Sequence, residues 1–115
     1  KIMAQVTTRT RNGVTIVDVV GGLVSGGDDP GVRGAVRQAL DGGATKIALN
    51  LGGVDFLNSS GINVLASSHA AVSDRGGTLK LVSVQPKVRD VLAIARLTSV
   101  FEIHGTEDEA VASFA

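Results

Sequence analysis

The sequence contains no cysteine, no tryptophan and no tyrosine, and its aromatic residues are three phenylalanines. The lack of cysteine excludes disulfides, thiol catalysis and thiolate metal sites. Hydrophobic residues make up 43% of the chain, so its core must be built from valine, leucine, isoleucine and alanine. Neither sign of charge dominates, with 11 basic and 11 acidic residues. We therefore expect no nucleic-acid partner bound by electrostatic attraction.

Long hydrophobic runs are missing as well. No stretch is apolar enough over a sufficient length to cross a bilayer, and none has the pattern of a signal peptide. A cytoplasmic protein without membrane insertion is therefore expected. A chain of 115 residues is large enough for one core and too small for two, which predicts a single domain over residues 1–115.

Glycine is abundant, and glycine pairs separate the segments that have periodic hydrophobic patterns. Asn12-Gly13 predicts a tight hairpin between the first two strands. Gly21-Gly22 is expected to end the second strand, and residues 23–27 are expected to form a loop or a short irregular strand. Asp28-Asp29-Pro30 is typical of a helix start, and Gly42-Gly43 predicts the end of that helix.

These patterns predict five strands and four helices. The expected strands are residues 4–11, 14–20, 47–51, 78–83 and 100–103. The expected helices begin at residues 28–30, 62, 86 and 106. The order strand–strand–helix–strand–helix–strand–helix–strand–helix predicts an α/β fold, an α+β-like mixed sheet of four to five strands backed by about four helices.

A serine pair lies where the third strand gives way to the second helix, in the run Asn58-Ser59-Ser60-Gly61-Ile62-Asn63. A helix N-terminus presents unpaired N–H groups and the positive end of the helix dipole. A serine hydroxyl there can cap the helix, and a phosphate would be well tolerated. From the residues alone, a plain helix cap is the simpler interpretation and a phosphorylation site is the alternative.

This run, together with the rest of the chain, resembles STAS domains, the fold of bacterial anti-sigma factor antagonists. In that family an aliphatic strand is followed by Asp-Ser-Ser/Thr/Ala-Gly-Leu-Gly at a helix N-terminus. The resemblance extends from the first hairpin to the last strand. It also rests on the residue runs 76–81, 91–97 and 100–102.

The resemblance implies a non-enzymatic regulator of transcription that works in signal transduction by protein–protein interaction. Its partners would be a serine-kinase anti-sigma factor and a serine phosphatase, and the protein itself a monomer or weak homodimer with no cofactor. The phosphorylated residue would be Ser59, with Ser60 as the alternative acceptor. The implied partner surface comprises Val24, Ser25, Gly26, Asn58, Ser59, Ser60, Gly61, Ile62 and Asn63.

Three residues depart from the family pattern on that surface. Asn58 stands where the motif has aspartate, and it can cap the helix but carries no charge. Val24 stands where many members have aspartate in the loop after the second strand. Asn63 replaces the second glycine of the motif and adds a larger polar group beside the serines.

The sequence gives little support for catalysis, nucleotide binding or metal binding. Ser59 lacks a nucleophile-elbow pattern, and His69 lies about three turns further along the same helix, too far to act as its base. His69 is interpreted as a partly buried packing residue, and His104 as a surface loop residue. The glycine pairs lack the spacing of nucleotide-binding loops, and the acidic residues at helix starts are interpreted as caps rather than metal ligands.

Three hypotheses follow, and they differ in what Ser59 does. The first is the phosphorylation-switched antagonist. The second is a STAS interaction or scaffold module of a transporter or signalling assembly that is not phosphorylated. The third, a small hydrolase with Ser59 as nucleophile, is disfavoured by the positions of the two histidines.

Overall fold

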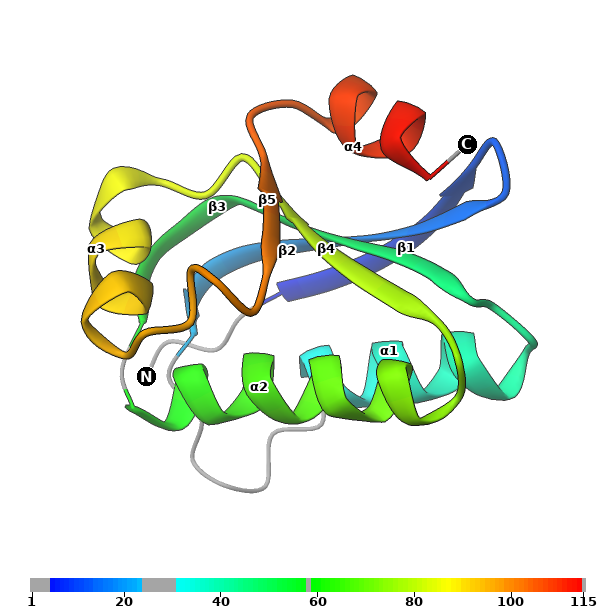
Figure 1. Ribbon diagram of the computed structural model, residues 1–115, viewed down its shortest axis with the longest axis horizontal. Coiled ribbons are helices and arrows are strands. Elements are labelled where there is room, and N and C mark those ends of the chain that lie inside the picture. The colour runs from blue at the N-terminus through cyan, green and yellow to red at the C-terminus, as the bar shows by residue number, and fades with distance from the viewer. Residues whose placement is uncertain (1–4, 24–30, 58, 115) are drawn as a thin grey trace.

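The computed structural model describes residues 5–23, 31–57 and 59–114. A sheet in these ranges is covered by helices on both faces (Figure 1). The strands are β1 (Gln5–Arg11), β2 (Val14–Leu23), β3 (Lys46–Leu57), β4 (Thr78–Val82) and β5 (Glu102–His104). The helices are α1 (Gly31–Asp41), α2 (Ser59–Asp74), α3 (Pro86–Ile94) and α4 (Glu107–Ser113). The predicted α/β class and the predicted order of elements are confirmed.

The strands lie side by side in the order in which they occur in the sequence, β1-β2-β3-β4-β5. β1 and β2 are antiparallel, and every later pair is parallel with a helix in its connection. Asn12 and Gly13 join β1 to β2 with φ values of 52° and 80°. A two-residue type I′ turn requires both residues in this left-handed region, so the Asn-Gly prediction is confirmed.

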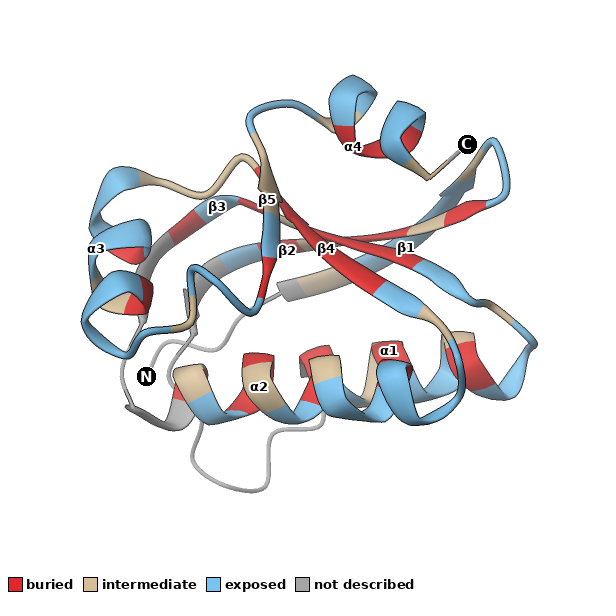
Figure 2. Ribbon diagram, in the orientation of Figure 1, coloured by how far each residue is buried: buried red, intermediate tan, exposed pale blue. Residues whose placement is uncertain are grey.

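Two hydrophobic cores lie on opposite faces of the sheet, because successive side chains of a strand point to opposite sides. The main core fills the space between the sheet and helices α1, α2 and α3 and includes Val17, Leu49, Leu65, Leu81 and Leu92. The smaller core lies under α4 and consists of Val14, Ile16, Ala48, Val82, Ala110 and Val111, with Phe114 packed against it. Figure 2 shows the buried residues along the sheet and on the sides of the helices that face it.

The smaller core also holds a buried lysine. Lys80 is 5% exposed, and its Nζ donates to the Oγ of Ser113 at 2.7 Å and pairs with Glu102 Oε2 at 2.9 Å. The ammonium also lies 4.4 Å from the centroid of the Phe114 ring. These partners compensate for the loss of water around the charge and connect β4 to both β5 and α4.

Two strands are longer than predicted, because glycine pairs lie inside them. β2 passes through Gly21-Gly22 to Leu23, and β3 passes through Gly52-Gly53 to Leu57. Beyond Asn50, β3 pairs with β2 alone, with register shifts where Val20 pairs with Gly53. A Cβ on Gly53 would lie 2.9 Å from Val20 Cγ2, so this glycine permits a close approach of the strands rather than a break.

Some helix and strand boundaries differ from those predicted, and one predicted boundary lies outside the described residues. β5 covers Glu102–His104 instead of residues 100–103, so His104 is a strand residue and the loop assignment was wrong. α2 begins at Ser59, three residues before the predicted start at Ile62. The predicted helix start at residues 28–30 lies outside the described residues.

The connection from α2 to β4 depends on a close backbone contact at Gly77. A Cβ there would lie 2.7 Å from the backbone oxygen of Thr45 and 3.0 Å from Val72 Cγ1. We expect Gly77→Ala to lower the free energy of unfolding by about 1–3 kcal/mol, because backbone must shift to admit the methyl group. Urea denaturation measures this change.

Gly42→Ala is the matched control for that variant. The nearest atoms to a Cβ on Gly42 are 3.5 Å away, an ordinary contact distance. Its stability should therefore stay within about 0.5 kcal/mol of the parent. Equal stabilities of the two variants would contradict the tight contact at Gly77.

Candidate functional site

The serine pair occupies the first two positions of α2, directly after β3 and Asn58. Gly61 is buried, Ile62 is half-buried against the main core, and Asn63 is exposed. The first turn of α2 therefore has a side held by the core and a side that faces solvent. The backbone of both serines lies in the first turn of α2, so their predicted position at a helix N-terminus is confirmed.

The electrostatics of this helix end favour an anion. The first N–H groups of an α-helix have no partner within the helix, and the dipole places partial positive charge there. The first turn of α2 contains no acidic residue that would neutralise that charge. A phosphate attached to the first turn would therefore be accommodated without disrupting the helix.

The ends of β2 and β3 lie next to each other at this edge of the sheet. Leu23 pairs with Leu57, and the two segments predicted to contact a partner follow directly in the sequence. Val24, Ser25, Gly26 and Asn58 themselves lie outside the described residues. Their membership of a common partner surface stays a prediction.

The two histidines take structural positions away from the serines. The ring of His69 contacts Phe101 edge to face, with centroids 5.2 Å apart and an interplanar angle of 81°. This confirms the interpretation of His69 as a partly buried packing residue. His104 Nε2 lies 2.5 Å from Glu102 Oε2 on β5. Within the described ranges, no group of three or more His, Asp or Glu side chains could hold a metal ion.

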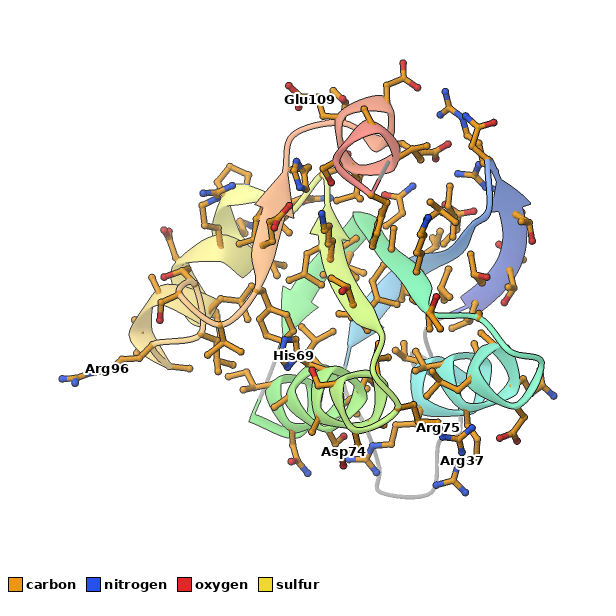
Figure 3. All side chains as sticks on the ribbon, turned by 45° about the vertical axis from the view of Figure 1, so that its right-hand side comes forward. Arg37, His69, Asp74, Arg75, Arg96 and Glu109 are labelled. Carbon is orange, nitrogen blue, oxygen red and sulfur yellow. The ribbon has the colours of Figure 1, made fainter. Side chains whose placement is uncertain are left out.

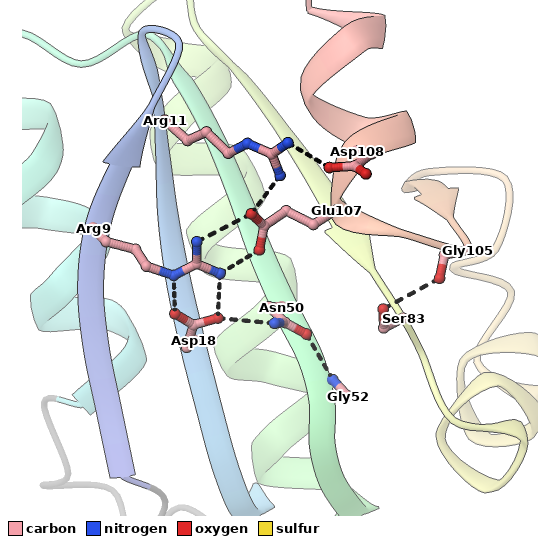
Figure 4. Close-up of polar contacts among 9 residues, drawn as sticks. All are labelled: Arg9, Arg11, Asp18, Asn50, Gly52, Ser83, Gly105, Glu107 and Asp108. Atoms are coloured by element: carbon pink, nitrogen blue, oxygen red, sulfur yellow. Dashed lines mark hydrogen bonds and ion pairs between the residues drawn. The ribbon is translucent and has the colours of Figure 1, made fainter.

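An extended polar cluster, which the sequence did not indicate, connects the hairpin to α4 (Figure 4). This hairpin–α4 cluster consists of Arg9, Arg11, Asp18, Asn50, Glu107 and Asp108. Arg9 binds Asp18 through two hydrogen bonds, of 2.6 and 3.1 Å, and also donates to both oxygens of Glu107. Arg11 Nη1 donates to Glu107 Oε2 at 2.8 Å. The cluster fixes α4 over the smaller core.

The carboxylates in this cluster are strongly stabilised in their charged form. Hydrogen bonds, first from Arg9 and then from Arg11, lower the pKa of Glu107 to about 2. The hydrogen bonds from Arg9 likewise lower the pKa of Asp18. A carboxyl group whose pKa is lower in the folded state contributes stability above its ordinary pKa, and that contribution is lost as the pH falls through the lowered value.

Glu107→Gln is therefore expected to destabilise the protein at neutral pH by about 1 kcal/mol. The value is modest because Arg9 and Arg11 are 46% and 39% exposed, and water screens their attraction. The parent should lose stability between about pH 5 and pH 2, and the variant should lose less over that interval. Thermal melts across this range measure both effects.

Glu109→Gln serves as the control, because Glu109 lies in the same first turn of α4 and is exposed. It removes the same charge near the same helix end without touching Arg9 or Arg11. The cluster would be irrelevant to stability if the two variants had the same pH profile.

No helix in the described part of the chain combines the length and the apolar character needed to span a bilayer.

Comparisons with known proteins point to one family and one fold. Residues 5–110 match the model of the STAS domain. BtrV of Bordetella bronchiseptica, a proposed anti-sigma factor antagonist, is 26% identical over 93 residues, which cover 81% of this chain and 80% of that protein. The anti-sigma F factor antagonist of Paenibacillus polymyxa is 26% identical over 112 residues, which cover 93% and 92% of the two chains.

Solved structures agree on the fold. The crystal structure of an anti-sigma factor antagonist from Mycobacterium paratuberculosis superposes with a TM-score of 0.81. The superposition covers 98% of this chain and 93% of that one, at 22% identity. The arrangement of the described strands and helices is thus one already known from antagonist structures.

Proposed function

Because the chain belongs to the STAS domain family, a non-enzymatic regulatory fold, we propose that it is an anti-sigma factor antagonist switched by phosphorylation of Ser59. In its unphosphorylated form it binds a serine-kinase anti-sigma factor and so frees a sigma factor, in the cytoplasm. Phosphorylation by that kinase releases it, and a serine phosphatase restores the binding form. Residues 1–115 act as a single domain in this scheme, as a monomer or weak homodimer.

The observation that carries the proposal is the position of Ser59. It is the first residue of the 16-residue α2, within the run that resembles the family's phosphorylated motif. The first turn has no acidic side chain, and the buried Gly61 and half-buried Ile62 hold the following residues against the protein. This position at a helix N-terminus, where the dipole gives partial positive charge, supports Ser59 as the phosphoacceptor.

The physical basis of the switch is a change of charge at an interface. A phosphoryl group adds about −1.5 to −2 charges at neutral pH. The N–H groups of the first turn stabilise that charge, so the fold survives the modification. An interface formed around a neutral hydroxyl does not, because it would have to bury an unpaired charge.

The proposed partner surface comprises Val24–Gly26 together with Asn58–Asn63. Asn58 gives this chain an uncharged residue before the serine, where the family motif has aspartate. A phosphate on Ser59 is therefore not opposed by a carboxylate on the preceding residue. The cognate kinase would recognise an amide at this position rather than a carboxylate.

A displacement assay tests the antagonist function itself. The chain is added to a complex of the anti-sigma factor encoded nearest to its gene and the corresponding sigma factor. We expect the labelled sigma factor to be released, as measured by fluorescence anisotropy, with a dependence on the concentration of the chain. Binding to the anti-sigma factor without any release of the sigma factor would contradict antagonism.

A further inference from the structure

A groove of about 600 Å³ lies between α1 and α2. The two helices pack against each other. Arg37 and Arg75 project beside one another on the side away from the sheet (Figure 3). The described residues that line the groove are Arg33, Val36, Arg37, Leu40, Asp41, Ser67, Ser68, Ala71 and Arg75. This volume is in the range of sites that hold small molecules.

The groove has an excess of positive charge. Three arginines and one aspartate line it. Arg75 Nη1 pairs with Asp41 Oδ1 at 3.0 Å, and Arg33 Nε donates to Ser67 Oγ at 3.2 Å. Arg37 has neither an ion pair nor a side-chain hydrogen bond with any residue that the structure describes. Among the described residues, most of the guanidinium N–H donors in the groove therefore have no partner and can bind a ligand.

A buried hydroxyl on the wall of the groove supplies a second, independent indication. Ser68 is 2% exposed, and its Oγ has no hydrogen-bond partner in the described part of the chain. The adjacent Ser67 differs, because its Oγ donates to the backbone oxygen of Asn63 at 2.8 Å and accepts from Arg33. Burying a hydroxyl without a partner costs free energy, which a ligand oxygen at this position would offset.

We propose that this groove binds a small organic phosphate. The phosphate group is held by Arg33 and Arg37, which lie one turn apart on α1 and whose planar guanidinium groups match its oxygens. Ser68 Oγ donates to a ligand oxygen, and the apolar part of the ligand contacts Val36, Leu40 and Ala71. A phosphate suits the site better than a single carboxylate, because it offers more oxygens and more negative charge to the two arginines.

The groove is separate from the phosphorylation site. Ser67 lies eight residues beyond Ser59 on α2, or about 12 Å along the helix axis. The inference therefore does not rest on the proposed function, and each can fail without the other. Ser59→Asp should leave the affinity of the groove unchanged within about twofold, since its charge lies beyond the Debye length at physiological salt.

Phenyl phosphate is a suitable probe, because it carries one phosphate monoester and one compact apolar group. In a titration of the ¹⁵N-labelled full chain, we expect saturable shifts of backbone amides in α1, in residues 63–74 of α2 and in Arg75, which follows α2. Inorganic phosphate should bind more weakly at the same amides, and phenol should not bind. The titrations with inorganic phosphate and with phenol separate recognition of the phosphate from recognition of the phenyl group.

Arg37→Gln should weaken phenyl phosphate binding about tenfold, because it removes a charged donor. Arg96→Gln removes the same charge from an arginine on the opposite side of the molecule (Figure 3) and should change the affinity by less than about twofold. Isothermal titration calorimetry gives these affinities.

Ser68→Ala distinguishes a ligand contact from a structural role. It should weaken phenyl phosphate binding, yet its melting temperature should equal or exceed that of the parent because an unpartnered buried hydroxyl is removed. The proposal is overturned if phenyl phosphate does not bind at millimolar concentration. It is equally overturned if Arg37→Gln and Ser68→Ala keep the parent affinity. The same holds if the backbone amides that shift are those around Arg9 and Arg11 of β1 instead of those of α1 and α2.

Discussion

Leu65→Ala is expected to lower the free energy of unfolding by about 3–4 kcal/mol, a large part of the stability of a small domain. Leu65 is fully buried on the face of α2 that packs into the main core. Truncation to alanine removes contacts on several sides and leaves a cavity that the neighbouring strands cannot close. Urea denaturation followed by circular dichroism measures the loss.

Ile94→Ala is the control for this variant. Ile94 lies at the end of α3 and is 84% exposed, so its truncation should change stability by less than about 0.5 kcal/mol. If Leu65→Ala were as stable as Ile94→Ala, the face of α2 that carries Leu65 would not anchor this helix to the main core. The position of Ser59 at the start of this helix would then lose its structural support.

Ser59→Asp is expected to weaken binding of the anti-sigma factor at least about 100-fold, while the melting temperature stays close to that of the parent. A carboxylate at the start of α2 is compatible with the helix dipole, so the fold is retained. Within an interface the same carboxylate is an unpaired buried charge, which costs several kcal/mol of binding free energy. Surface plasmon resonance with the immobilised anti-sigma factor gives the ratio of affinities.

Ser73→Asp introduces the same charge on an exposed serine at the other end of α2. It lies about 21 Å along the helix axis from Ser59 and should bind the partner as the parent does. Affinity that is indifferent to Ser59→Asp would favour a constitutive interaction module instead. This outcome is the one that the unphosphorylated scaffold hypothesis predicts.

Local patterns in the sequence were sufficient for most of the fold. The Asn12-Gly13 turn and the alternation of the flanking strands predicted the hairpin, and helical spacing predicted the elements that cover the sheet. Strand ends were harder, because a glycine pair has the same appearance in a turn and in a strand. Only the approach of Val20 to Gly53 shows that these glycines let β2 and β3 continue side by side.

The candidate site was predictable only where it is local. The serine run and its position before a helix are both features of neighbouring residues, so the sequence predicted them. Arg9 and Glu107 are 98 positions apart, and their contact depends on how α4 crosses the sheet. The pairing of Arg33 with Ser67 likewise depends on how α1 and α2 pack, which hydrophobic periodicity does not specify.

The histidines illustrate the same limit. Spacing on one helix showed that His69 is too far from Ser59 to act as its base. It could not show that Phe101, from a different part of the chain, provides the ring against which His69 packs. That contact arises because the turn before β5 returns the chain to the face of α2.

Phosphorylation of Ser59 is tested most directly by the intact mass of the protein after incubation with ATP and the anti-sigma kinase encoded nearest to its gene. The account predicts a gain of one phosphoryl group in the parent and in Ser60→Ala, and no gain in Ser59→Ala. An unmodified parent, or a full gain of mass in Ser59→Ala, would contradict it.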